Sequence, residues 1–201
     1  MSRRRTSQSS IKRAIRAKAL VAQLRKEQNP LNQKMLLLGY ITDRLEKAKQ
    51  HVFLVGGQAV ETYTAGQFTT GDMDITTTDS KATKTVLASL GFEQIGMVWL
   101  NKRLGVAVHI VGLFPNANLD KVRTIQVGPY KVNVIGVEDL ILDRLAHVKF
   151  FKMAGDLEKA KVLYTNFKRQ IDEKYLRETA KKRGVEDILN QARILESPSQ
   201  N

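Results

Sequence analysis

Apolar residues along this chain follow two spacings, one typical of helices and one typical of strands. After Asn29 and Pro30, a common N-cap and first helical position, the apolar residues from Leu31 to Leu45 recur on one stripe and predict a helix that packs on a sheet. Strand-like and helical segments alternate through the first two thirds of the chain, and the spacing from Val137 onward is helical. The pattern therefore predicts an α/β (α+β) protein with two closely packed lobes, the second of them helical.

Two parts of the pattern predict strands directly. Residues 51–55 contain a short apolar run that ends at the glycine pair Gly56 and Gly57. The segments 122–127 and 130–135 alternate apolar and polar residues and are joined by a Gly-Pro pair, which is typical of a hairpin.

The glycine pair lies between the strand at 51–55 and a segment at 58–64 that has helical spacing. Glycines at such a turn let backbone N–H groups approach an anion, and the helix that begins there points its positive dipole end at the same place. Gly56 and Gly57 therefore predict a phosphate-binding turn. Glycine pairs are also common in turns that bind nothing.

Asp72 and Asp74 lie two residues apart on a predicted strand, so both carboxylates leave the same face while Met73 and Ile75 turn toward the core. Two carboxylates on one face repel each other, and a hard dication such as Mg²⁺ is bound by one or two such groups together with substrate phosphates. The pair predicts a metal site beside the phosphate-binding turn. An isolated Asp-x-Asp is otherwise often an exposed strand end.

Together, these motifs resemble a known family. The glycine pair, Tyr63-Thr64, Gly66 and the run from Thr70 to Ile75 look like the minimal nucleotidyltransferase domain of the DNA polymerase beta superfamily. More narrowly, they resemble small prokaryotic members related to the nucleotidyltransferases of toxin-antitoxin and abortive-infection systems. Segments 90–92, 137–145 and 149–160 continue the resemblance, which covers about residues 35–192.

The residue pattern predicts a helical C-terminal lobe and a basic N-terminal helix. The resemblance implies a nucleotidyltransferase fold, with a mixed sheet flanked by helices. It also implies transfer of a nucleoside monophosphate from a triphosphate to an acceptor hydroxyl. Enzymes of the superfamily place three carboxylates around two metals, and the third comes from a later strand, expected here at 105–111. The matching position is His109, a departure from the family pattern.

Three roles for His109 stay open. An imidazole ligates Mn²⁺ or Zn²⁺ but is a poor ligand for Mg²⁺. It can act as a general base near neutral pH. It can also be a histidine satisfied by hydrogen bonds, in a protein that binds a nucleotide without turning it over.

The resemblance further implies that Arg144 and Lys149 contact the triphosphate, and that Thr70 donates its hydroxyl to a phosphate. The alternative is a solvated helix face for the two cations and an ordinary strand start for Thr70. Glu138 and Asp139 are expected to serve the first turn of their helix, through capping and the dipole.

The formal net charge is +13, and more than half of the excess lies in the first 28 residues. We expect this basic segment, helical from Ser9 onward, to bind a phosphate backbone without reading sequence. Its candidate nucleic-acid contacts are Arg3, Arg4, Arg5, Lys12, Arg13, Arg16 and Lys18. Basic, acid-poor starts also resemble organellar transit peptides, and charge runs are often solvated tails.

These features predict four segments. A basic N-terminal helix or arm occupies 1–28, the nucleotidyltransferase core 29–136, the helical C-terminal lobe 137–196 and a disordered tail 197–201. Cysteine is absent, so there is no disulfide framework, thiolate metal site or thiol nucleophile. No apolar run is long enough to span a membrane and no signal-peptide core follows the basic start, so we expect a cytoplasmic protein with no membrane partner.

Two functions follow as hypotheses. The first is an enzyme that uses Mg²⁺ or Mn²⁺ to move a nucleoside monophosphate from a nucleoside triphosphate (NTP) to RNA, protein or a small molecule. The second is a catalytically impaired protein of the same fold that binds nucleic acid or a protein partner in a toxin-antitoxin or defence system.

Overall fold

The computed structural model describes residues 2–113 and 117–193. By their contacts, the residues fall into two compact units, and neither unit is continuous in the sequence. The first unit comprises residues 1–54, 71–114 and 124–133, and the second comprises 55–70, 115–123 and 134–201. The segment boundaries expected from the sequence stay predictions, and the expected tail at 197–201 lies outside the described residues.

A seven-stranded mixed sheet forms the framework of the first unit, with the strand order β3-β4-β5-β2-β1-β7-β6. The central strands β2 and β5 are parallel, whereas β1 pairs with β2, β3 with β4, and β4 with β5 in the antiparallel direction. The strands are β1 (Val52–Leu54), β2 (Asp72–Thr77), β3 (Glu93–Ile95), β4 (Val98–Asn101), β5 (Val106–Gly112), β6 (Arg123–Val127) and β7 (Tyr130–Val134). The predicted mixed sheet and the predicted hairpin are confirmed, and the hairpin boundaries agree to within one residue.

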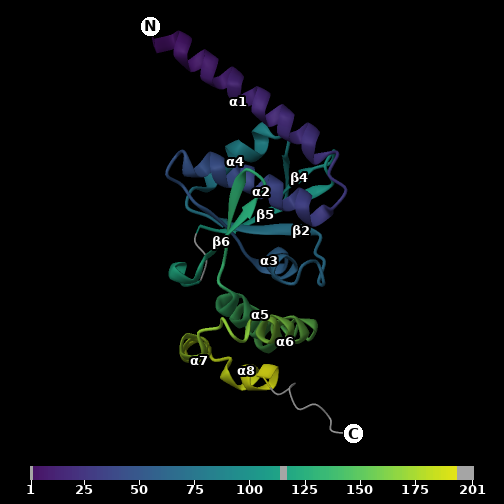
Figure 1. Cartoon of the computed structure of the whole chain (residues 1–201), viewed down its shortest axis with the longest axis vertical. Helices are drawn as coiled ribbons and strands as arrows, with labels where there is room; N and C mark the ends of the chain where they lie inside the picture. The colour runs from purple at the N-terminus through teal and green to yellow at the C-terminus, as the bar shows by residue number, and fades with distance from the viewer. Residues whose placement is uncertain (1, 114–116, 194–201) are drawn as a thin grey trace. The chain divides into compact units, whose positions relative to one another are not determined.

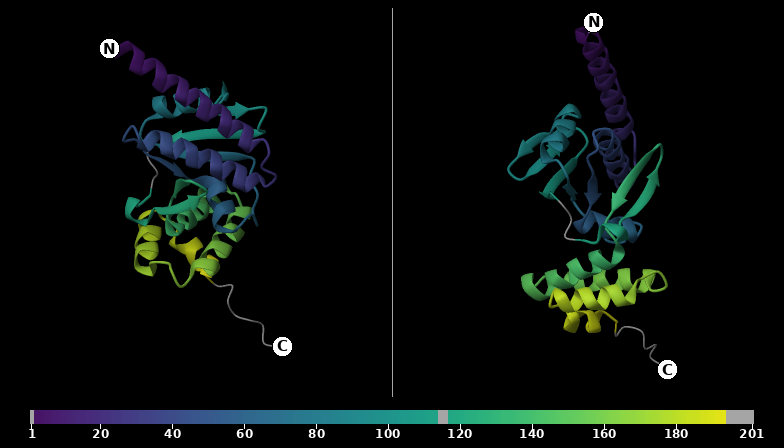
Figure 2. Two further views of the ribbon diagram at one scale, coloured as in Figure 1. Left: turned by 45° about the horizontal axis from the view of Figure 1, so that its top comes forward. Right: turned by 90° about the vertical axis from the view of Figure 1, so that its left-hand side faces the viewer.

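Three helices belong to the first unit: α1 (Ser2–Leu24), α2 (Pro30–Glu46) and α4 (Ser80–Ser89). The helix α2 begins where the sequence predicts, because the Asn29 side chain accepts a hydrogen bond from the backbone N–H of Asn32 at 3.1 Å. Helices α2 and α4 contact each other, and α2 also packs on β1 (Figures 1 and 2). No helix within the described residues is long and apolar enough to cross a membrane.

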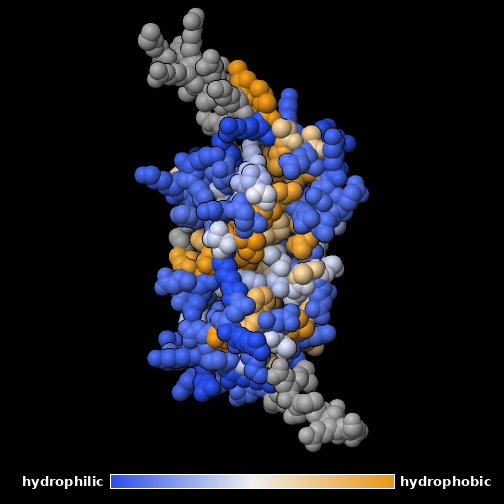
Figure 3. All heavy atoms as spheres, viewed as in Figure 1, coloured by the Kyte–Doolittle hydropathy of each residue, from blue (hydrophilic) through white to orange (hydrophobic). Residues whose placement is uncertain are grey.

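The predicted N-terminal helix is confirmed as α1, and its second half packs on the unit. Ala17, Leu20 and Leu24 are buried, whereas Ile11 and Ile15 are more than half exposed. Figure 1 shows the N-terminal end of the α1 ribbon projecting from the unit, and Figure 3 shows apolar residues along the part of the helix that is coloured. The buried residues Ala17, Leu20 and Leu24 fix the helix to the unit.

The two faces of β2 differ in chemistry, as the alternation in the sequence predicts. Met73 and Ile75 are fully buried on one face. On that same face the Thr77 hydroxyl lies 2.8 Å from the hydroxyl of Thr83 in α4, so α4 covers the apolar side of the strand. The carboxylates of Asp72 and Asp74 therefore leave the opposite side.

The second unit is helical, apart from a single 3-10 turn. Its elements are α3 (Gly56–Tyr63), the 3-10 turn η1 (Leu119–Lys121), α5 (Val137–Phe151), α6 (Gly155–Phe167), α7 (Glu173–Lys182) and α8 (Glu186–Arg193). Helix α5 lies at the centre, since α3, α6, α7 and α8 all pack on it. Its fully buried residues Leu140, Ile141 and Leu145 supply the apolar surface for these contacts.

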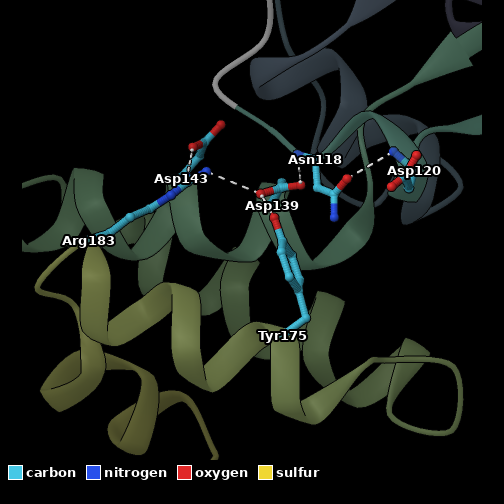
Figure 4. Close-up of polar contacts among 6 residues, drawn as sticks. All are labelled: Asn118, Asp120, Asp139, Asp143, Tyr175 and Arg183. Atoms are coloured by element: carbon cyan, nitrogen blue, oxygen red, sulfur yellow. Dashed lines mark hydrogen bonds and ion pairs between the residues drawn. The ribbon is translucent and has the colours of Figure 1, made fainter.

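Asp139, in the first turn of α5, is fully buried at the centre of the polar cluster in Figure 4. Its carboxylate accepts hydrogen bonds from the Asn118 backbone N–H at 2.9 Å, the Tyr175 hydroxyl at 2.8 Å and the Arg183 guanidinium at 3.1 Å. Arg183 also donates to Asp143 at 2.9 Å. Burial raises the pKa of Asp143, and the charge of Arg183 acts against that rise. Asp139 thus connects α5 to α7 and to the loop at Asn118. Its role therefore extends beyond the expected capping and dipole interaction in the first turn of α5.

Candidate active site

The side chains of Asp72, Asp74 and His109 meet on one face of the sheet in the first unit. Asp72 and Asp74 leave β2 on the same side, and His109 is the register partner of Asp74 on the parallel strand β5. One potential ligand atom from each of the three side chains lies within 4.8 Å of the others. The structure therefore brings the three predicted catalytic residues together, although His109 is 35 positions beyond Asp74 in the sequence.

His109 contacts Asp74 directly, with 3.3 Å between Nδ1 and a carboxylate oxygen. The two side chains are 25% and 26% exposed, so both are accessible from solvent and neither is fully screened by it. If the Nδ1 proton is donated to Asp74, the other ring nitrogen is left as the basic atom. The contact orients both the imidazole and the carboxylate.

Gly56 and Gly57 belong to the second unit, where they form the first turn of α3 rather than a turn before it. Gly56 has a φ of 65°, in the left-handed region that favours glycine. At Gly57 a Cβ atom would lie 3.0 Å from the Thr70 hydroxyl oxygen. The buried carboxylate of Glu61 accepts a hydrogen bond from the Thr70 backbone N–H at 3.3 Å, so the position of Thr70 is fixed. Gly57 and Thr70 are thus brought together, and each also has a packing role.

Two buried polar side chains were missed by the sequence analysis. Gln58 follows the glycine pair and is fully buried, yet neither its amide oxygen nor its nitrogen has a hydrogen-bond partner within the described residues. Thr76, two residues beyond Asp74 on the same side of β2, has a buried hydroxyl that also lacks a partner there. Buried polar groups are normally hydrogen-bonded, so both are candidate ligand contacts. A glutamine directly after the glycine pair was the available signal.

Arg144 and Lys149, the two predicted triphosphate contacts on α5, both have carboxylate partners inside the second unit. Arg144 is buried, and its guanidinium lies 3.2 Å from Asp156, whose side chain is 2% exposed. Lys149 lies 2.8 Å from Asp187, whose side chain is 58% exposed. The first pair is enclosed by protein and the second lies at the surface.

Of the predicted nucleic-acid contacts, Arg16 and Lys18 are exposed on α1. The structure does not describe the side chains of the other five predicted contacts, which are Arg3, Arg4, Arg5, Lys12 and Arg13.

Comparison with known proteins adds evidence on the fold. No protein-family model matches the chain, and no curated protein matches its sequence. An antigenic nucleotidyltransferase-like protein from Paracoccidioides brasiliensis matches in structure with a TM-score of 0.53 and 15% identity, over 83% of this chain and 93% of its own. The solution structure of the antibiotic-resistance factor ANT(2'')-Ia matches with a TM-score of 0.51 and 13% identity, over 80% of this chain and 96% of its own. This chain has a nucleotidyltransferase fold.

These matches confirm the predicted fold class. At 13% and 15% identity these matches are evidence for the fold only. Substrates and acceptors have to be inferred from the residues of this chain. The narrower resemblance to toxin-antitoxin nucleotidyltransferases stays a prediction.

Proposed function

We propose that this protein is a metal-dependent nucleotidyltransferase. In the reaction, an acceptor hydroxyl oxygen bonds to the α-phosphorus of an NTP, the bond to the bridging oxygen breaks, pyrophosphate leaves and the hydroxyl proton passes to a base. The observation that carries the proposal is the convergence of Asp72, Asp74 and His109 within 4.8 Å on one face of a nucleotidyltransferase fold.

The donor atoms of these residues fit a divalent cation. Two carboxylates supply the hard oxygen ligands that Mg²⁺ and Mn²⁺ prefer. Asp72 and Asp74 would hold the ion, which when bound neutralises charge on the phosphate oxygens. Without a cation, the two carboxylates would repel both each other and a triphosphate.

His109 has two parts in the proposal. Its contact with Asp74 holds that carboxylate in place, and its second ring nitrogen accepts the proton of the acceptor hydroxyl. A third carboxylate would add negative charge for a second metal, which a neutral imidazole does not. We therefore propose that Asp72 and Asp74 would hold Mg²⁺ or Mn²⁺ and that His109 accepts the proton.

The other proposed NTP contacts belong to the second unit. The proposed phosphate contacts are the backbone of Gly56 and Gly57 in the first turn of α3 and the hydroxyl of Thr70. Lys149 remains a candidate because its pair with Asp187 is exposed and opens at little cost. Arg144 would have to break an ion pair in which both side chains are buried, so we assign it a structural role instead.

The acceptor is left as a class, a hydroxyl of RNA, protein or a small molecule. The alternative function is a catalytically impaired protein that binds nucleic acid or a partner in a toxin-antitoxin or defence system. Two observations favour this alternative function. His109 occupies the position of the third carboxylate, and the exposed residues Arg16 and Lys18 make α1 basic.

Isothermal titration with each NTP, with and without Mn²⁺ or Mg²⁺, tests the proposal. The wild type should bind an NTP only when the metal is present. Asp72→Asn/Asp74→Asn should show no gain in NTP binding when the metal is added, because the carboxylates that would hold the ion are gone. Asp43→Asn/Asp120→Asn removes the same charge away from the site and should behave as the wild type.

Transfer is then measured with an α-labelled NTP and pooled acceptors. Asp72→Asn should abolish transfer, and His109→Gln should lower the rate because the proton acceptor is lost. Full activity in Asp72→Asn would overturn the proposed reaction. Binding that is metal-dependent and yet yields no transfer would favour the impaired alternative.

A further inference from the structure

A solvent-open hollow of about 540 Å³ lies on the other side of the sheet in the first unit, between α4 and β4. It is lined by Ser80, Lys81, Lys84, Thr85, Ala88 and Trp99. Trp99 pairs with Val108, whereas the neighbouring Val98 pairs with His109, so Trp99 leaves the sheet on the face away from the imidazole. The hollow is therefore separate from the candidate active site.

The helix α4 turns a stripe of residues into this hollow at the spacing i, i+3, i+4 and i+7. The packing face of α4 is formed by Thr83 and Leu87, so this stripe lies on its exposed face. Two residues of the stripe are Lys81 and Lys84, both exposed, one helical turn apart. Neither ammonium group has a carboxylate partner among the described residues. Two cations without counter-charges thus face one hollow.

Trp99 supplies the apolar wall opposite these cations. It is the only tryptophan in the chain and is partly exposed. In the described part of the chain, no other aromatic ring and no cation packs on its indole. A large ring with an accessible surface beside two ammonium groups matches the recognition of a base together with its phosphates.

Cations also follow Trp99 along the chain. Lys102 and Arg103 lie exposed on the turn after β4 and line the adjacent hollow with Val21 of α1. The first unit as a whole holds more than half of the 33 Lys and Arg residues but only about a third of the 20 Asp and Glu residues. Glu93 is the one acid among the lining residues of these two hollows. This excess of cations over acids suits a chain of phosphates better than a single phosphate.

We propose that this hollow is a binding site for single-stranded nucleic acid, in which a base stacks on Trp99 and the flanking phosphates contact Lys81 and Lys84. The chemistry recognised is a nucleobase with adjacent phosphates, and its source is a strand rather than a free nucleotide. In the proposed reaction, such a site would anchor a nucleic-acid acceptor. The site itself does not depend on that reaction.

The single tryptophan makes the test direct, because intrinsic fluorescence reports on Trp99 alone. Titration of the full chain with a 12-nucleotide single strand should quench this fluorescence, and the affinity should fall as salt rises. Lys81→Gln/Lys84→Gln should weaken binding and reduce the logarithmic salt slope by about 1.4, from about 0.7 for each phosphate contact. Lys174→Gln/Arg177→Gln removes two exposed cations at the same spacing on α7 and should leave the quenching unchanged.

The stacking contribution is measured with a labelled oligonucleotide by anisotropy. Trp99→Leu should lower the affinity about tenfold or more, and Trp99→Phe, which keeps an aromatic ring, should lower it less. Circular dichroism and thermal unfolding establish that each variant is folded. The exposed lysine pair tests the site independently should Trp99→Leu fail to fold.

Several outcomes would overturn the proposal. Quenching that is absent, or that survives Lys81→Gln/Lys84→Gln, would place the nucleic acid elsewhere. Equal quenching by a mononucleotide at the same base concentration would make the ligand a free nucleotide, and equal quenching by polyglutamate would make it an acidic polypeptide. Asp72→Asn/Asp74→Asn should quench as the wild type does, so the site can fail or stand separately from the proposed transferase reaction.

Discussion

Replacement of Asp156 by asparagine is expected to destabilise the second unit more than any other single loss of charge discussed above. The Asp156 carboxylate is 2% exposed and lies 3.2 Å from Arg144 Nη1, 2.8 Å from His147 Nδ1 and 2.7 Å from Lys159 Nζ. Burial opposes ionisation, but the hydrogen bond from Lys159 and the charge of Arg144 outweigh it and lower the pKa of Asp156. The carboxylate is therefore charged at neutral pH.

The magnitude follows from the burial of Arg144. Its side chain is only 7% exposed, so Asp156→Asn leaves a guanidinium buried without its counter-charge. Removal of one partner of a buried pair costs about 3–5 kcal/mol. For a chain of this length, that corresponds to a fall of about 6–20 °C in the thermal midpoint. Because Lys159 and His147 are about one-third exposed, they add little to this figure.

The assay is thermal or urea unfolding of Asp156→Asn beside Glu158→Gln, an exposed acid two residues along α6. The double variant Arg144→Met/Asp156→Leu, which removes both charges, should recover most of the stability. A folded-state pKa below the unfolded value means that the stabilisation is present above the unfolded pKa, and is lost as the pH falls through the folded pKa. The stability difference between wild type and Asp156→Asn should therefore shrink below about pH 4. A loss no larger than that of Glu158→Gln would refute this account of the pair.

Two further predictions concern the first unit. Asp79→Ala should cost about 1 kcal/mol in an unfolding assay, because the Asp79 side chain caps α4 by accepting a hydrogen bond from a first-turn N–H at 2.9 Å, whereas Asp79→Asn keeps the cap and should cost much less. Gly39→Ala should cost about 1–3 kcal/mol, since the added Cβ would lie 2.6 Å from the Cβ of Tyr130; if the variant is as stable as the wild type, this close approach does not constrain the sheet.

The parts of the fold that could be predicted are those determined by residues close together in the sequence. The cap at Asn29, the apolar run at 52–55 and the two faces of β2 are local patterns, and the structure has each of them. The glycine pair was predicted as a turn between a strand and a helix. It lies instead in the first turn of α3, where glycine allows the left-handed φ of Gly56.

The residues of the candidate site could be predicted from the sequence, but the contacts between their side chains could not. His109 could be matched to a family position, but its contact with Asp74 exists because β5 inserts in parallel next to β2. The hydrogen-bond partners of the charged residues on α5 could not be predicted either, because they come from segments distant in the sequence. Glu138 and Asp139 looked like first-turn acids, yet they accept hydrogen bonds from Asp172 and Asn118, which are supplied by other elements of the unit.

Topology also decides which basic residues are suited to bind a ligand. The sequence points to the N-terminal segment, because its cations are consecutive, but no aromatic residue accompanies them there. Lys81 and Lys84 are separated from Trp99 along the chain, and the fold brings them to one hollow between α4 and β4. Charge density alone gives an affinity that salt removes, whereas a ring beside two cations adds a contact that salt does not screen. If that reasoning holds, binding that remains at high salt belongs to Trp99, and the salt-sensitive remainder belongs to the lysines and to α1.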